Sequence, residues 1–296
     1  MHPVKKILGA VVATFASLTL TATHANAAPA SNVVMFGDSF FANPTYAQVG
    51  GVQAMPGSSE IFYQGQPGAP SPQGCPQGQS NIGNELKTLG HNVVNMACSS
   101  AKAGGESQRS NMYSQVGHAI DTNALNASTG NVLIQFGAND APSLMMDNPV
   151  TGASSDLILG EDYARGMRDN INRIRQAAPN AKITVVSYPA VSAPNGALCP
   201  VRTDINNSGP GFNLDYLATV HNAEKFINSN MYQAARDNGV DFYDLNGATK
   251  YNNMCAKNSD RYIAGAIETG VPHNLSIHIT HKGNSEIARL LDSSAM

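Results

Sequence analysis

The sequence predicts an α/β protein with a parallel sheet that is covered by helices on both faces. Short apolar runs alternate along the chain with longer amphipathic segments, and Gly and Pro are frequent between them. Strands buried on both faces read as continuous apolar runs, and their alternation with helices is typical of a parallel sheet. No internal repeat or linker divides residues 28–296, so we expect one domain there.

Five short apolar segments are the candidate strands. They are enriched in Val, Ile, Leu and Phe, and they are shorter than an ordinary helix. The carboxyl ends of parallel strands meet at one edge of the sheet, where the active sites of such folds lie, so residues that follow these strands are the first candidates for function. In chain order the segments are residues 32–36, 91–96, 131–136, 182–186 and 240–245.

The clearest helix is expected over residues 161–178. Apolar side chains from Tyr163 to Ile174 recur there at spacings of four, four and three, which gives one apolar stripe, and Pro179 ends the helix. Three further helices are expected at residues 80–89, with Ser80 as the cap, at 213–237, and at 282–291.

The first residues of the chain have the layout of a secretory signal peptide. Lys5 and Lys6 give a cationic start, residues 7–20 are almost entirely apolar, and Ala25-Asn26-Ala27 matches a cleavage site. The apolar run is shorter than the roughly 20 residues of a membrane span, which disfavours the alternative of an uncleaved anchor. We therefore expect residues 1–27 to be removed, and the mature protein to be secreted or held in the cell envelope without a stable membrane span.

The charge balance disfavours nucleic acid as a partner. Only 13% of the residues are charged and the net charge is -3, whereas binding to nucleic acid requires a basic patch. The chain also has no P-loop and no dinucleotide fingerprint. We expect a monomer that uses no cofactor.

The cysteine count favours disulfide bonds. All 4 cysteines follow the expected cleavage site, and an even number in an exported protein is typical of paired cysteines. Three pairings are possible in principle, and we favour Cys75–Cys98 with Cys199–Cys255 because each bond then closes one contiguous loop region. A zinc site is the alternative, but the chain has no C-x-x-C pair.

Ser39 follows the first predicted strand in the tripeptide Gly37-Asp38-Ser39 and is our candidate nucleophile. A serine hydroxyl attacks only when a base takes its proton and donors hold the oxyanion that forms. Gly37 permits a sharp turn, and a helix that begins at Ser39 points its first N–H groups towards developing negative charge. Taken alone, the tripeptide is more typical of a helix N-cap than of a nucleophile, and the other blocks of the sequence change this balance.

Three further blocks follow in order: Cys98-Ser99-Ser100 after the second strand, Gly137-Ala138-Asn139-Asp140 after the third, and His278-Ile279-Thr280 before the last helix. In their order and separation, the four blocks resemble the SGNH (GDSL-type) hydrolase family over nearly the whole mature chain. The stretch from Cys75 to Cys98 is especially similar to the secreted actinobacterial lipases and esterases of that family, in which the corresponding cysteines are bonded. The resemblance implies a three-layer α/β/α sandwich around a parallel, flavodoxin-like five-stranded sheet.

The resemblance also implies roles for the residues that match the family's motifs. Ser39 would be the nucleophile, and His278 would be the general base and later the general acid. The backbone N–H groups of Ser39 and Ser100 and the side-chain amide of Asn139 would form the oxyanion hole. Asp38 and Asp140, which flank these residues, are expected to accept N–H bonds in the strand-to-helix turns.

Two positions depart from the family's pattern. Ser100 stands where the family usually has Gly, which keeps the backbone donor but adds a side chain that could narrow the acyl site. Leu275 stands where the family commonly has the Asp that orients the catalytic histidine. That role then falls either to a backbone carbonyl, which gives a Ser–His dyad, or to an Asp distant in sequence.

Other histidines offer alternatives to this assignment. His281 is a rival base, but the spacing of His278 to Thr280 and Gly283 fits the family's His-x-Thr-x-x-Gly pattern. His273, His278 and His281 together would be a metal site, but three histidines without a carboxylate partner are more typical of a surface or catalytic turn. We expect no metal.

The sequence therefore predicts hydrolysis of carboxylic esters through an acyl-enzyme on Ser39. Loops 43–80, 142–160 and 192–212 are expected to shape the acyl pocket, and their apolar and small polar side chains favour a lipid or an acylated glycan as the substrate. One alternative is an extracellular acyltransferase that uses the same nucleophile. Another is a degenerate, non-catalytic envelope-binding protein, to which the missing Asp at position 275 points. The apolar loop residues behind the substrate expectation are Phe62, Tyr63, Leu144, Met145, Met146, Leu157 and Ile158.

Overall fold

The computed structural model describes residues 32–48, 72–105, 110–141, 159–203 and 211–296. The expected signal peptide at residues 1–27 lies outside these ranges. So do the apolar loop residues on which the substrate expectation depends, namely Phe62, Tyr63, Leu144, Met145, Met146, Leu157 and Ile158.

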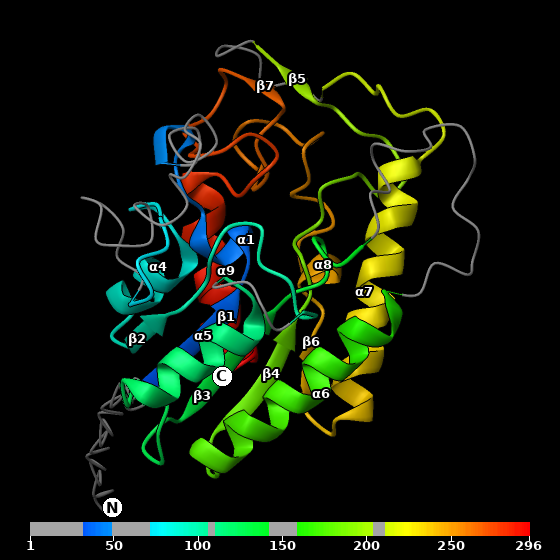
Figure 1. Ribbon diagram of the computed structural model, residues 1–296. Helices are drawn as coiled ribbons and strands as arrows, with labels where there is room; N and C mark the ends of the chain where they lie inside the picture. Colours follow the sequence, from blue (N-terminus) through cyan, green and yellow to red (C-terminus); the bar gives the residue numbers. More distant parts are fainter. Residues whose placement is uncertain (1–31, 49–71, 106–109, 142–158, 204–210) are drawn as a thin grey trace, which may run out of the picture.

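A five-stranded parallel sheet forms the centre of the molecule (Figure 1). The strand order is β2-β1-β3-β4-β6, so the chain begins inside the sheet and reverses direction after β2. This order is the flavodoxin-like one, and it confirms the predicted fold class. The strands are β1 (Asn32–Gly37), β2 (Asn92–Asn95), β3 (Asn131–Gln135), β4 (Lys182–Val186) and β6 (Asp241–Tyr243).

Helices cover both faces of the sheet because alternate strand residues point to opposite sides. Val34 and Phe36 pack with α5, α6 and α7 on one face, whereas Val33 and Met35 pack with α4, α8 and α9 on the other. The helices are α1 (Ser39–Ala42), α4 (Ile82–Thr88), α5 (Met112–Asp121), α6 (Gly160–Ala177), α7 (Thr219–Asp237), α8 (Leu245–Ala248) and α9 (His281–Ser294). None of the helices in the described part of the chain has the length and apolar character to cross a membrane.

Some boundaries differ from the sequence expectation. The cap of α4 is Asn81 rather than Ser80, because the Asn81 side chain accepts the Asn84 N–H at 2.9 Å. Helix α7 begins at Thr219 rather than at residue 213, and the apolar residues before it lie in an irregular segment with a turn at Tyr216 and Leu217. Helix α5 was not expected.

Two disulfides tie loops at the carboxyl edge of the sheet, and they are the two pairings that we favoured. Cys75 is bonded to Cys98, which holds the loop after β2 to the segment before α4. Cys199 is bonded to Cys255, which joins the loop after β4 to the segment after α8. Close to the second bond, a two-stranded parallel pair forms from β5 (Val201–Arg202) and β7 (Ile267–Glu268).

Candidate active site

Ser39 lies where β1 turns into α1, at the carboxyl edge of the sheet. Gly37 ends the strand where neighbouring groups approach the backbone closely, because a Cβ at this position would lie 2.9 Å from the Phe41 ring and 3.1 Å from the Gln135 carbonyl oxygen. Asp38 is the N-cap of α1 and accepts the Phe40 N–H at 2.9 Å, so Ser39 is the first residue of the helix.

Gln115 holds this turn from the unexpected helix α5. Its side-chain oxygen accepts the Gly37 N–H at 3.0 Å, and its amide nitrogen donates to the Gly37 carbonyl at 2.8 Å. Gln115 is fully buried, so it satisfies two backbone groups that water does not reach. Sequence reasoning missed this residue. The spacing of Met112, Val116 and Ala119 was the available signal for the helix that carries it.

The side chain of His278 is hydrogen-bonded to that of Ser39. The distance from His278 Nε2 to Ser39 Oγ is 2.8 Å, and the distance from His278 Nδ1 to the Ser276 carbonyl oxygen is also 2.8 Å. A carbonyl can only accept, so Nδ1 carries the ring proton and the neutral Nε2 is free to accept from the serine hydroxyl. The carbonyl of Ser276 is therefore the group that orients the imidazole, and Leu275 is buried in place of the family's Asp.

The surroundings of His278 favour the neutral imidazole. Its ring stacks on Phe40 with a centroid distance of 4.9 Å. Burial lowers the pKa of His278 below its ordinary value of 6.5, and the bond to Ser276 opposes that shift only in part. A neutral imidazole at neutral pH can take a proton from Ser39.

The backbone between the Ser276 carbonyl and His278 is strained at Ile277. Ile277 has φ 61°, which is an outlier for a β-branched residue. The segment is held in this form because the Ile277 N–H donates to Gly265 O at 3.3 Å and the His278 carbonyl accepts the Ala264 N–H at 2.9 Å. The left-handed turn at Ile277 lets the Ser276 carbonyl reach the side chain of the residue two positions later.

Asn139 and the loop that carries Ser100 are bonded to the residues that precede Ser39. Asn139 Nδ2 donates to Asp38 Oδ2 at 3.3 Å and to the Ala101 carbonyl at 3.0 Å, so its amide hydrogens already have acceptors. An incoming oxyanion has to replace one of these acceptors, and the longer bond to Asp38 is the weaker of the two. The Cys98 N–H donates to the Gly37 carbonyl at 3.1 Å, which fixes the start of the loop that carries Ser100.

Ser100 adopts φ 60°, which explains why the family usually has Gly there. Glycine reaches the left-handed region without the steric cost that a side chain brings, about 1–2 kcal/mol. The Ser100 side chain is exposed, so its added volume lies towards solvent.

Asp38 and Asp140 have the structural roles that were expected of them, with one extension. Asp38 is buried and also accepts the Tyr188 hydroxyl, and burial raises the pKa of its carboxyl to about 7, although the bonds from Tyr188 and from the Phe40 N–H act in the opposite direction. Asp140 accepts from a different loop, at the N–H groups of Ala103 (3.0 Å) and Gly104 (2.9 Å). It thereby connects the third sequence block to the second.

The rival histidines lie elsewhere. His281 Nε2 contacts Asn274 Oδ1 at 2.9 Å, and His273 Nδ1 contacts the Val271 carbonyl at 3.0 Å. Neither ring has a hydrogen bond to Ser39 among the described contacts. Within the described ranges, no three His, Cys, Asp or Glu side chains come together as a metal site requires.

A cavity of about 560 Å³ opens beside Asp140. Leu159 and Gly160, from the end of an expected pocket loop, contribute to its wall together with Lys102 and Tyr163. The lining combines apolar and charged groups.

The family model described as "GDSL-like Lipase/Acylhydrolase family" matches residues 35–285. This match covers most of the 296 residues. The chain therefore belongs to the GDSL-like lipase/acylhydrolase family, of the SGNH hydrolase type, and so to the class of carboxylic ester hydrolases.

Individual relatives are more distant. An esterase of Streptomyces scabiei is 28% identical over 145 residues, which are 43% of this chain and 42% of that esterase. The chain thus matches less than half the length of this curated relative.

Solved structures support the fold. A phospholipase A1 from Streptomyces albidoflavus is 19% identical with a TM-score of 0.53, and the match covers 89% of this chain and 99% of that one. An extracellular lipase from Streptomyces rimosus is 18% identical with a TM-score of 0.54, over 90% of this chain and 100% of that one. At these identities the likeness is one of fold.

Proposed function

We propose that this protein hydrolyses carboxylic esters through an acyl-enzyme on Ser39, outside the cytoplasm and without a cofactor. The observation that carries the proposal is the bond between Ser39 Oγ and His278 Nε2 at 2.8 Å, with the ring proton held on Nδ1 by the Ser276 carbonyl. A nucleophile, its base and the group that orients the base are thus connected in one chain of hydrogen bonds.

In the first half of the reaction, His278 takes the proton of Ser39 as the serine oxygen attacks the ester carbonyl. The N–H groups of Ser39 and Ser100 and the amide of Asn139 donate to the oxyanion. Protonated His278 then gives its proton to the leaving alcohol, and the acyl group stays on Ser39. In the second half, His278 takes a proton from water as the water oxygen attacks the acyl carbonyl. Protonated His278 then returns this proton to the Ser39 oxygen as the bond to the acyl group breaks and the acid leaves.

The location outside the cytoplasm is supported by two features of the chain. The two disulfides persist in oxidising compartments, and the start of the chain reads as a signal peptide. The Streptomyces rimosus lipase, which shares the fold, is itself an extracellular protein.

The test uses purified mature protein with p-nitrophenyl esters of several acyl lengths, beside Ser39→Ala. We expect release of p-nitrophenol by the parent protein, and neither release nor labelling by a fluorophosphonate probe in Ser39→Ala. Activity that survives in Ser39→Ala would overturn the assignment of the nucleophile. Absence of both hydrolysis and labelling in the parent would favour the non-catalytic binding protein, and an acylated product after addition of a sugar acceptor would favour the acyltransferase.

A further inference from the structure

The segment that leads into α7 turns its apolar side chains to solvent. Phe212 and Tyr216 are each 84% exposed, Leu217 is 67% exposed and Leu214 is 58% exposed. The alternating residues Asn213 and Asp215 are partly buried. The usual pattern of a surface segment, with polar side chains out and apolar side chains in, is therefore reversed.

Polar side chains fix this orientation from the inside. Asn213 Oδ1 accepts the N–H groups of Leu198 and Asp215, each at 2.9 Å. The Asp215 carboxylate accepts the Val220 N–H at 2.8 Å in the first turn of α7. Turning the segment over would leave these bonds unmade, so the apolar side chains are held outward.

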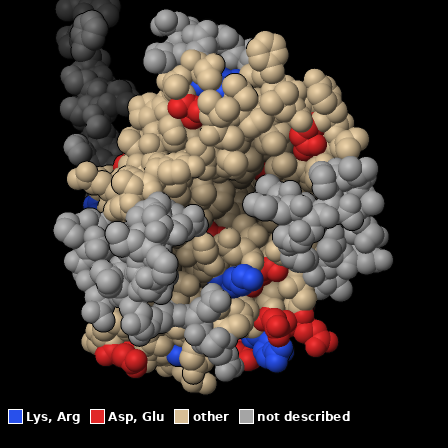
Figure 2. Space-filling model, turned by 45° about the horizontal axis from the view of Figure 1, so that its top comes forward, with Lys and Arg blue, Asp and Glu red and all other residues tan. Residues whose placement is uncertain are grey.

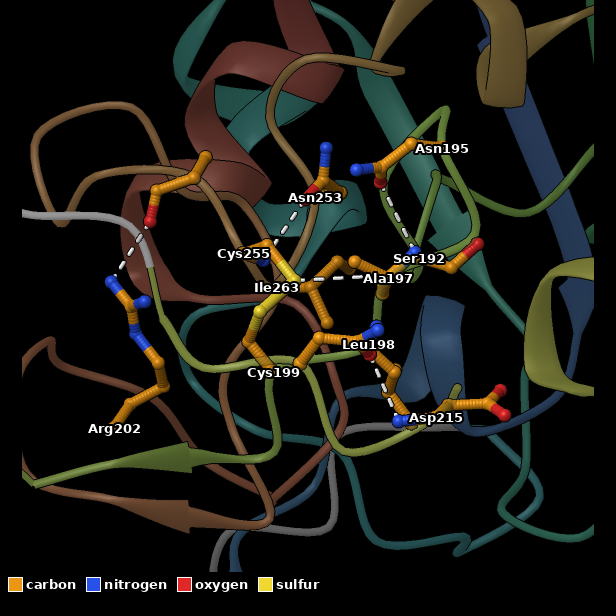
Figure 3. Close-up of a disulfide and its surroundings, with 12 residues drawn as sticks. Ser192, Asn195, Ala197, Leu198, Cys199, Arg202, Asp215, Asn253, Cys255 and Ile263 are labelled. Carbon is orange, nitrogen blue, oxygen red and sulfur yellow. Dashed lines mark hydrogen bonds between the residues drawn. A yellow bond between two sulfur atoms is a disulfide. The ribbon is translucent and has the colours of Figure 1, made fainter. Parts of the chain in front are cut away.

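The backbone of the segment is anchored to a disulfide-linked corner. The Leu214 N–H donates to the Leu198 carbonyl at 2.8 Å, and the Gly211 N–H donates to the Cys255 carbonyl at 3.3 Å. A Cβ at Gly211 would lie 2.6 Å from the Cβ of Cys199, so the chain packs directly on the bonded cysteines. Figure 3 shows this corner, with Leu198 beside the disulfide and the segment of Asp215 next to it.

The segment lies on the same side of the molecule as the candidate active site. It enters α7 at the end of that helix near the carboxyl edge of the sheet, where β1 delivers Ser39 (Figure 1). Figure 2 turns this edge towards the viewer and shows a hollow near its centre, with few charged side chains over the upper part of the face. If this segment binds an apolar surface, that surface therefore faces the carboxyl edge of the sheet, where Ser39 lies.

The charge and the size of the segment at residues 212–217 limit the kinds of partner that can bind it. Residues 212–217 contain no Lys or Arg, and the neighbouring Arg202 is buried, so the exposed Lys225 in α7 is the nearest cation along the chain and attraction to an anionic surface is weak. A stable protein interface takes roughly 20–30 residues on each side, which four side chains of one short segment do not supply. Protruding aromatic and leucine side chains are instead typical of proteins that insert into the boundary between lipid head groups and acyl chains.

We propose that residues 212–217 form a docking segment that inserts Phe212, Leu214, Tyr216 and Leu217 into a zwitterionic phospholipid layer. The inference deepens the proposed function, on which it rests, because it selects lipid rather than acylated glycan as the substrate class. Docking places the carboxyl edge of the sheet against the layer, so an ester reaches Ser39 without first dissolving in water.

Vesicle binding tests the docking without hydrolysis. In the Ser39→Ala background, co-sedimentation with phosphatidylcholine vesicles should show binding that Phe212→Ser and Leu217→Ser each weaken roughly tenfold, because each removes one inserted apolar side chain. Leu89→Ser is the matched control. Leu89 is 40% exposed and lies between α4 and β2, at the opposite edge of the sheet, so binding should not change.

Activity separates a failure of docking from a failure of the proposed function. The Phe212→Ser/Leu217→Ser variant, with Ser39 present, should hydrolyse soluble p-nitrophenyl acetate at the parental rate and lose at least tenfold on an ester dispersed in phosphatidylcholine vesicles. Equal vesicle binding by parent and double variant, absence of parental binding to phosphatidylcholine, or binding only to phosphatidylglycerol vesicles would each overturn the docking segment. A parental dimer that the double variant abolishes would also overturn it, in favour of a second copy.

Discussion

The turn that carries Ser39 is held by side chains, whereas the turn that carries His278 is held by backbone groups. Asp38 and Gln115 bind the Ser39 turn through their carboxylate and amide. The His278 turn has the Ser276 carbonyl behind the ring and N–H bonds that join Ile277 and His278 to the segment opposite. The two halves of the proposed catalytic pair thus depend on different features of the sequence: the identity of the side chains for the serine turn, and the path of the backbone for the histidine turn.

Of the variants described below, the one that removes the base His278 should lower the catalytic rate most. We expect His278→Ala to lower kcat by roughly 10⁴-fold or more, as loss of a catalytic histidine does in serine hydrolases. His281→Ala is the matched control and should keep most of the activity, because His281 bonds to Asn274 rather than to Ser39. Steady-state kinetics on a soluble ester measures both. The reverse ranking of the two variants would make His281 the base.

On the serine side, Asn139→Ala should lower kcat by about 10²–10³-fold, the usual cost of one oxyanion donor. KM should change little, because the bond to the oxyanion forms in the transition state. The same assay reports kcat and KM separately. A change confined to KM would show that Asn139 binds the substrate rather than the transition state.

Gln115→Leu tests how far the serine turn depends on a buried side chain. It leaves the N–H and the carbonyl of Gly37 without the Gln115 bonds, and we expect a loss of about 2–4 kcal/mol in the free energy of unfolding. Urea denaturation measures this loss. Gln233→Leu, on the exposed face of α7, is the control and should change stability by less than about 0.5 kcal/mol.

The pH dependence of the hydrolysis rate tests the protonation state of His278. The base works in its neutral form, and burial lowers the pKa of His278 below 6.5. Loss of the base should therefore begin only as the pH drops below that value, since protonation at the lowered pKa removes it. A profile of kcat/KM on a soluble ester measures the acid limb, and imidazole NMR separates His278 from Asp38, whose pKa burial raises to about 7. A midpoint of the His278 ring above 6.5 would contradict the environment described for that ring.

Ser276→Ala should have the smallest effect. The structure uses the carbonyl of Ser276, which any residue supplies, so we expect kcat/KM within about twofold of the parent value. A large loss on the same soluble ester would mean that the Ser276 hydroxyl contributes to catalysis.

The sequence predicted the sheet well because the central strands β1, β3 and β4 contain consecutive apolar residues that are buried on both faces, which leaves a clear signal. It placed the start of α7 too early because Leu214, Tyr216 and Leu217 read as the first turn of an amphipathic helix, whereas they lie exposed before it. The short helix that carries Gln115 was missed, since a ten-residue segment gives few apolar repeats.

Within the site, Ser39, Asn139 and His278 were proposed from recognisable side chains in the four sequence blocks. The group that orients His278 could not be identified, although a carbonyl was one of the two alternatives. Every residue has a carbonyl, and only the left-handed backbone at Ile277 brings this one to the ring. Backbone conformation at a single exposed residue leaves no pattern in the sequence.

The use of a carbonyl behind the histidine has a consequence for how this site tolerates genetic change. A point substitution can delete a carboxylate, but none can delete a main-chain oxygen, so the orienting group of His278 is robust to most substitutions at Ser276. The same design makes the segment sensitive to insertions and deletions, because one residue more or less between Ser276 and His278 moves the oxygen away from Nδ1. Sequence drift in this loop should therefore keep its length while its residue types vary.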